Sequence, residues 1–217
     1  MMNKEVLTME YLLCVLDEEG KLPTFSTEKE ICFYAAQLIE LIDLGWVVLE
    51  GKKLQLTDKG SEPPVYLEPM FEIVKKSKGK RVADFAGNLT FTLTGKPRRE
   101  MLEACLEVME EANLLETTVK KGLLGTKEYR TVKAEEKDRV IQKIRAEFLE
   151  EGQISEETVL LGCLLDKTSL LKKYFSAYEA KMLKQRLKEL RKAPENKLIN
   201  EMIDSVDTLI AVIAATA

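Results

Sequence analysis

The side chains most suited to chemistry form a cluster of cations in the middle of the chain. Residues 75–99 hold eight basic side chains and one acidic one, a local net charge of +7, although the whole 217-residue chain has a net charge of −4. Pro97 favours a helix start, so we expect Arg98 and Arg99 in a first turn whose unpaired N–H groups also attract anions. This pattern predicts an anion-binding surface, with Lys80 and Arg81 as secondary members. The alternative is a solvated helix end, where cations are stabilised by the helix dipole.

A second feature is a pair of leucines between two glycines. In the segment VKKGLLGTKEYR, Leu123 and Leu124 occupy the tip of a predicted hairpin over residues 115–132, beside several lysines. Apolar side chains ringed by cations suit insertion among anionic lipid head groups. The same tip suits a contact with a second copy of the chain, and a tip that folds back onto its own domain is a third alternative.

The residue types and their spacing in the sequence do not indicate a catalytic or metal site. The chain has no histidine, which excludes histidine-dependent triads and histidine-ligated zinc. The cysteines lack CxxC spacing and lie in apolar runs, so we expect small buried hydrophobic residues in a reducing compartment. They are Cys14, Cys32, Cys105 and Cys163. Because no spacing of lysines and carboxylates converges on a site, we expect neither an enzyme, nor a cofactor, nor a metal ion.

The elements that must position these residues are mostly helical. Apolar periodicity predicts helices over residues 9–18, 27–44, 67–77, 82–89, from Pro97 onward, 134–151, 155–165, 170–190 and 194–217. Gly-containing turns predict hairpins over 46–56 and 115–132. Thr8 is expected to cap the first helix, and Glu30 to close a capping box with Thr27. We therefore predict a mainly α fold, a single compact helical domain over residues 1–217 with two small β-hairpins.

Location is predicted from what the apolar segments lack. The first apolar stretch is too short for a signal peptide and is followed by acidic residues. The longest candidate for a membrane span is the ten-residue segment 208–217, whereas about 20 residues are needed. We expect a cytoplasmic protein whose contact with membranes is peripheral.

Several segments, taken in order, resemble the Golgi phosphoprotein 3 family over almost the whole chain. They are LTMEYLLCVLDEEGKL, AAQLIELIDLGWVVLEGKKLQL, REMLEACLEVMEEANLLE, KKGLLGTKEYRTVKAEEKDRVIQKIRAEFL and MIDSVDTLIAVIAATA. The resemblance implies a helical, non-enzymatic domain that binds phosphatidylinositol 4-phosphate on a cytosolic membrane face. It also implies an adaptor role for the cytosolic tails of membrane proteins and a hairpin linked to self-association at the membrane side.

The resemblance carries over to the individual site residues only in part. The family pocket uses an aromatic residue after the first helix, which here is Phe25, and an arginine in the second helix, which here is Tyr34. Of two arginines three residues apart in a later helix, Arg98 or Arg99 remains. The second falls on Met101 or Leu102. These departures look like those of a divergent prokaryotic member and imply weaker head-group binding.

Two further patterns have competing interpretations. Helix, helix and hairpin over residues 9–56 imitate a winged-helix DNA-binding motif, but residues 31–44 lack lysine and arginine, which a recognition helix needs. The lysine-rich segment 170–192 is interpreted as a solvated helix face, with a lipid or nucleic-acid contact as the alternative. We therefore expect a peripheral membrane module that binds a phosphoinositide or another anionic lipid head group, rather than a nucleic acid.

Overall fold

The computed structural model describes residues 6–23, 27–50, 53–59, 62–77, 79, 81–85, 96–122, 125–150, 152–192 and 197–216. The helices are α1 (Leu7–Val15), α2 (Thr27–Asp43), the 3-10 helix η1 (Val65–Leu67), α3 (Glu68–Lys76), α5 (Lys96–Glu111), α6 (Ala134–Leu149), α7 (Glu156–Lys167), α8 (Leu171–Tyr174), α9 (Ala177–Leu190) and α10 (Lys197–Thr216). Residues 82–85 are also helical. The strands are β1 (Val47–Glu50), β2 (Lys53–Leu56), β3 (Leu115–Gly122) and β4 (Gly125–Val132). The prediction of a mainly α fold with two small hairpins is confirmed.

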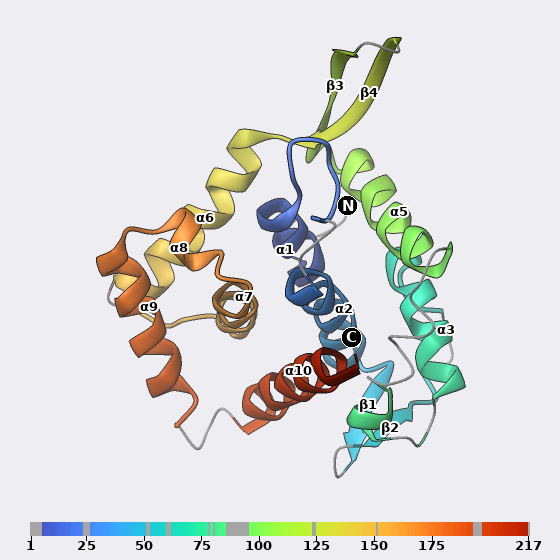
Figure 1. Cartoon of the computed structure of the whole chain (residues 1–217). Coiled ribbons are helices and arrows are strands. Elements are labelled where there is room, and N and C mark those ends of the chain that lie inside the picture. The colour runs from blue at the N-terminus through green and yellow to red at the C-terminus, as the bar shows by residue number, and fades with distance from the viewer. Residues whose placement is uncertain are drawn as a thin grey trace.

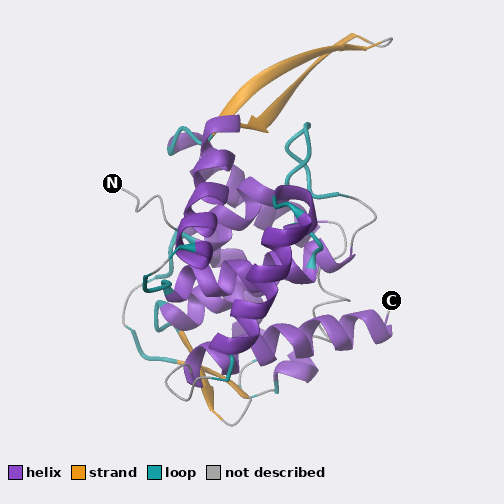
Figure 2. Cartoon of the chain, turned by 90° about the vertical axis from the view of Figure 1, so that its left-hand side faces the viewer, coloured by secondary structure: helices purple, strands orange, loops and turns teal. Residues whose placement is uncertain are grey.

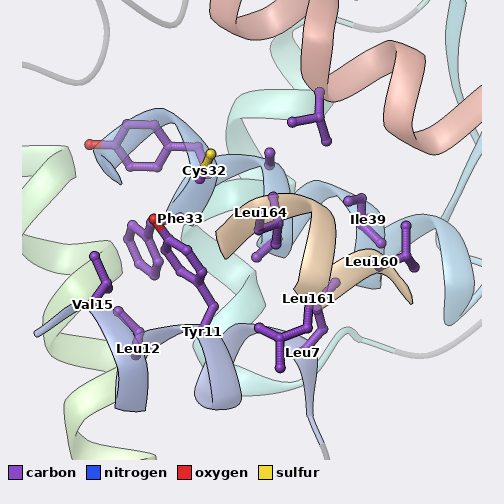
Figure 3. Packing of buried hydrophobic residues seen from close by; sticks show 14 of the residues in the cluster. Leu7, Tyr11, Leu12, Val15, Cys32, Phe33, Ile39, Leu160, Leu161 and Leu164 are labelled. Carbon is purple, nitrogen blue, oxygen red and sulfur yellow. The ribbon is translucent and has the colours of Figure 1, made fainter. Parts of the chain in front are cut away.

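Helix α2 lies at the centre of the fold (Figure 1). Every residue from 31 to 41 is buried, because α1, α7 and α10 pack around this helix. Figure 3 shows side chains of α1, α2 and α7 meeting in the core, among them Tyr11, Phe33 and Leu161. Burial of this apolar surface stabilises the fold by about 25 cal/mol per Å². A helix enclosed on this scale cannot enter a DNA groove, so the winged-helix interpretation is not favoured.

The other helices lie on two sides of this core. In Figure 1, α3 and α5 lie on one side of α2, and α6, α8 and α9 lie on the other. Each β-hairpin is antiparallel, with registers that run from Val47↔Leu56 to Glu50↔Lys53 and from Leu115↔Val132 to Gly122↔Gly125. The β3–β4 hairpin projects from the helical body in both views (Figures 1 and 2).

The first helix differs from its prediction at both ends. It begins at Leu7, and the N-cap residue Val6 makes no side-chain cap hydrogen bond. Thr8 lies within the helix, where its buried hydroxyl donates to Glu40 instead of capping. The helix ends at Val15 rather than at residue 18, because the Asp17 carboxylate accepts the N–H groups of Glu19 (2.8 Å) and Lys21 (3.0 Å) in a turn.

The helix predicted over residues 170–190 is two helices. The break lies at Ser176, whose hydroxyl accepts the N–H of Glu179 at 3.2 Å, while the Glu179 carboxylate accepts the N–H of Ser176 at 2.8 Å. This reciprocal capping box starts α9 and satisfies two backbone donors that a continuous helix would have paired internally. Apolar periodicity alone hides such a break, because the same face stays buried on both sides of it.

Candidate functional site

The first turn of α5 carries the two arginines that the sequence singles out. Arg98 is about one-third exposed, and its Nε lies 3.0 Å from Oε1 of Glu30, near the start of α2. Arg99 is exposed. The first N–H groups of a helix have no intrahelical partner and carry partial positive charge, which adds to the two guanidinium groups. This end of α5 is therefore cationic, and Arg98 joins it to α2.

The carboxylate that contacts Arg98 also contacts Tyr34. The buried Tyr34 lies one turn beyond Glu30 on α2, and its hydroxyl donates to Oε1 of Glu30. Burial, and then the negative charge of Glu30, raise the pKa of Tyr34 well above its ordinary value, so the hydroxyl stays protonated and acts as a donor. The position at which the family resemblance implies an arginine thus holds a neutral hydrogen-bond donor. Of the two positions where that resemblance implies a second arginine, Met101 is buried and Leu102 is partly buried.

The sequence pattern does not indicate Glu30 as a site residue. The sequence assigns it to a capping box with Thr27, whose side chain lies outside the described residues. In the structure its half-buried carboxylate binds Arg98 and Tyr34. The only sequence signal is the four-residue spacing of Glu30 and Tyr34 on one helix face. An anion that approaches Arg98 must displace this internal carboxylate or share the arginine with it.

The remaining predicted site residues are distributed differently. Arg81 is exposed and forms an isolated β-bridge with Lys53 at the start of β2, so it lies beside the first hairpin rather than against Glu30. Phe25 and Lys80, predicted for the anion site, lie outside the described residues. Leu123 and Leu124, predicted for membrane insertion or self-association, also lie outside them.

The β3–β4 hairpin is anchored at its base. Nη2 of Arg130 lies 2.7 Å from Oε2 of Glu103 on α5. Gly20, with φ of +69°, passes so close beneath the hairpin that an added Cβ would lie 1.8 Å from the carbonyl oxygen of Arg130. Further along β3, Val119 is 58% exposed. The base of the hairpin is therefore rigidly held, and an apolar side chain farther out is open to a partner or a membrane.

An acidic hollow of about 230 Å³ lies where α1, α2 and α7 meet. Four carboxylates line it, and none of its described lining residues is a cation; they are Glu40, Asp43, Glu156 and Glu157. Burial raises the pKa of Glu40 to about 7, although the hydrogen bond from Thr8 favours the charged form. Apolar residues including Ile39 and Leu160 complete the lining. Such a hollow suits a positively charged ligand with an apolar portion.

The cysteines confirm the expectation of buried hydrophobic residues. All four are free and buried, and burial raises the pKa of Cys14, Cys32 and Cys163 to about 12 and that of Cys105 further still. Thiols so rarely ionised are poor nucleophiles. In the part of the chain that the structure describes, no three cysteine or acidic side chains gather as metal ligands. Within the same residues, no helix combines the length and apolar character needed to span a bilayer.

Comparison with known proteins adds one match. A family model described as Golgi phosphoprotein 3 (GPP34) matches residues 7–206, nearly the whole chain. No curated protein matches the chain.

Proposed function

The chain belongs to the Golgi phosphoprotein 3 family, and on that premise we propose that it is a non-enzymatic peripheral membrane module that binds an anionic lipid head group at the start of α5. Arg98 and Arg99 are the proposed phosphate contacts. The observation that carries the proposal is the position of Arg98, partly exposed in the first turn of a helix and paired with the Glu30 carboxylate. The protein would act in the cytoplasm and attach reversibly to a membrane surface.

The proposed head group is a phosphoinositide, with phosphatidylinositol 4-phosphate indicated by the family. A guanidinium group offers a phosphate paired hydrogen bonds that a lysine cannot reproduce. Phe25 is the proposed aromatic contact, with Lys80 and Arg81 as secondary cations. Because Tyr34 and either Leu102 or Met101 stand where the resemblance implies arginines, two charge-assisted bonds of about 1.5–3 kcal/mol each are missing. We therefore propose weaker head-group binding than an intact four-residue pocket would give.

The hairpin supplies the proposed second point of contact. The exposed Val119 and the rigid base at Arg130 support a role for β3–β4 in holding Leu123 and Leu124 toward a bilayer or a second copy of the chain. Apolar side chains of this size gain about 0.8 kcal/mol for each buried CH₂ group. Together with the arginines, such insertion would give the two signals that stable membrane attachment requires.

An adaptor role is the second candidate function, supported by the acidic hollow. Its four carboxylates and apolar walls complement a peptide that carries both lysine or arginine and apolar residues. Cytosolic tails of membrane proteins have this character where they leave the bilayer, because cytoplasmic flanks are enriched in cations. In this proposal, lipid binding brings the protein to the membrane and the hollow selects the tail.

Vesicle flotation tests the lipid proposal. Neutral vesicles, vesicles with a generic anionic lipid and vesicles with phosphatidylinositol 4-phosphate would each be mixed with the wild-type protein and with Arg98→Ala/Arg99→Ala. The control variant is Arg186→Ala/Lys197→Ala, which also removes two positive charges, both exposed, one on α9 and one on α10.

Three outcomes are informative. Selective flotation with the phosphoinositide, lost in Arg98→Ala/Arg99→Ala and kept in the control variant, supports the head-group site. Equal flotation with any anionic lipid supports a generic electrostatic surface instead. Absence of flotation with every vesicle refutes the membrane proposal and leaves the adaptor as the better account.

A further inference from the structure

A second basic surface lies between α8 and α9. A hollow of about 720 Å³ is lined by four lysines together with Phe175, Ala177, Ala180 and Gln185. The lysines are Lys172, Lys181, Lys184 and Lys188. None of the described residues that line this hollow is acidic, although the whole chain is net negative. In Figure 1, α9 and α5 lie at opposite edges of the molecule, so this basic groove is separate from the Arg98 site.

Helix geometry brings the lysines together. Lys181, Lys184 and Lys188 are three and four residues apart, which places them on one face of α9, and Lys172 comes from α8. The orientation of α9 is fixed at its start by the capping box of Ser176 and Glu179. Glu179 is held in turn by Arg145 of α6, whose Nε lies 2.8 Å from Oε1 of Glu179. The groove is thus built on elements whose positions are set by contacts outside it.

Most of the positive charge in the groove is uncompensated. Nζ of Lys184 lies 2.5 Å from Oδ1 of Asp166. The other three lysines form no ion pair with any residue in the described ranges. Like charges on one helix face destabilise it by a few tenths of a kcal/mol for each pair, a cost that a bound anion would remove. The lack of acidic residues among those that line the groove sets it apart from an ordinary solvated face, where both signs alternate.

Three apolar residues also line the groove. Phe175 is buried, and the guanidinium carbon of Arg145 lies 5.4 Å from the centroid of its ring. Ala177 and Ala180 present only methyl groups, which leaves the space between the lysines open. A volume of about 720 Å³ falls within the range of small-molecule sites, about 300–1,000 Å³.

We propose that this basic groove binds an anion that carries at least two phosphate groups. Lysine ammonium groups bind phosphates as compact point charges. Lys181 and Lys188 are seven residues apart, about 10 Å along the helix at 1.5 Å per residue, a spacing that two or more linked phosphates match better than one. The phosphates belong either to a soluble compound or to a lipid head group, and the experiment separates these sources.

Calorimetric titration at low salt tests the proposal with inorganic phosphate and with tripolyphosphate. The test variant is Lys181→Ala/Lys188→Ala, in which both changed side chains are exposed. The control is again Arg186→Ala/Lys197→Ala, because Arg186 lies on the same helix but pairs with Glu189 at 3.5 Å, outside the groove. We expect tripolyphosphate to bind the wild type more tightly than phosphate, and the test variant to bind it roughly tenfold or more weakly. The control variant should match the wild type.

Vesicles with phosphatidylinositol 4-phosphate identify the source of the phosphates. Flotation reduced in Lys181→Ala/Lys188→Ala assigns the groove to a lipid head group, and unchanged flotation with weakened tripolyphosphate binding assigns it to a soluble compound. Because Arg98→Ala/Arg99→Ala leaves the groove intact, failure of the α5 site and failure of the groove are distinguishable. The proposal is overturned if Lys181→Ala/Lys188→Ala matches the wild type with both tripolyphosphate and these vesicles, whether both bind or neither does, or if the test and control variants lose binding equally.

Discussion

Replacement of Glu30 by glutamine should strengthen binding to anionic vesicles. The carboxylate of Glu30 neutralises Arg98 at 3.0 Å and would repel an incoming phosphate. Glutamine removes the negative charge but keeps a carbonyl oxygen that can accept the Tyr34 hydroxyl. The start of α2 should therefore keep its packing while the arginine becomes available.

The size of this effect follows from two terms. A partly exposed ion pair contributes about 1 kcal/mol or less, and this is recovered when Arg98 no longer has to leave a partner. Repulsion between a carboxylate and a phosphate about 6 Å away adds about 1 kcal/mol in a largely aqueous surrounding. The sum, about 1–2 kcal/mol, lowers the dissociation constant by about five- to thirtyfold. The free energy of unfolding should fall by less than about 1 kcal/mol.

Co-sedimentation with vesicles over a range of lipid concentrations measures this dissociation constant. The matched control is Glu28→Gln, an exposed carboxylate on the same helix, which changes the net charge equally. If Glu28→Gln strengthened vesicle binding equally, the effect would come from the change in overall charge and not from the release of Arg98. Unchanged or weaker binding by Glu30→Gln would refute the reasoning, because Glu30 would then position Arg98 rather than compete for it.

Three further predictions concern stability and reactivity. Gly20→Ala should lower the free energy of unfolding in urea by about 2 kcal/mol or more, because it strains a positive φ and meets the Arg130 carbonyl oxygen; a loss below 0.5 kcal/mol would contradict this packing. The native state holds the Glu40 proton more tightly than the unfolded chain, since the pKa is raised from 4.5 to about 7, so this group's stabilising contribution is complete below pH 4.5 and is lost as the pH rises through 7. The free energy of unfolding of Glu40→Gln should therefore exceed that of the wild type by up to about 3 kcal/mol at pH 8. If the free energies of unfolding of the two proteins changed in parallel with pH, this prediction would be wrong. The four cysteines should resist Ellman's reagent until urea unfolds the chain, and rapid native labelling would contradict their burial.

Most elements of the fold were predictable because their signals are local. Apolar periodicity and glycine turns located the central helix and both hairpins, and the start of α7 was placed within one residue. The predicted helix boundaries were wrong where a polar side chain could form a hydrogen bond with more than one partner. The sequence predicts Thr8 as a helix cap, yet in the structure its hydroxyl donates a hydrogen bond to the carboxylate of Glu40, 32 residues away. Ser176 looked like one polar residue on a continuous helix face, whereas its reciprocal bonds with Glu179 end one helix and begin another.

The candidate site was predictable only on its cationic side. Pro97 and the adjacent arginines mark a helix start in the sequence, and the structure places Arg98 there with its guanidinium partly exposed. Glu30 precedes Arg98 by 68 positions, and only the packing of α5 against α2 brings the two together. The basic groove required the same kind of information, because Lys172 and the lysines of α9 converge only after the chain turns at Ser176.

The central claim, that Arg98 contacts a lipid phosphate, is tested most directly by NMR titration of the wild-type protein with inositol 1,4-bisphosphate, the soluble head group of phosphatidylinositol 4-phosphate. The side-chain Nε–H signal of Arg98, assigned by its loss in Arg98→Lys, reports on the atom that faces Glu30. Our account predicts a saturable shift of this signal, at lower ligand concentration in Glu30→Gln. An unmoved Arg98 signal, with shifts confined to α9 or absent throughout, would contradict it.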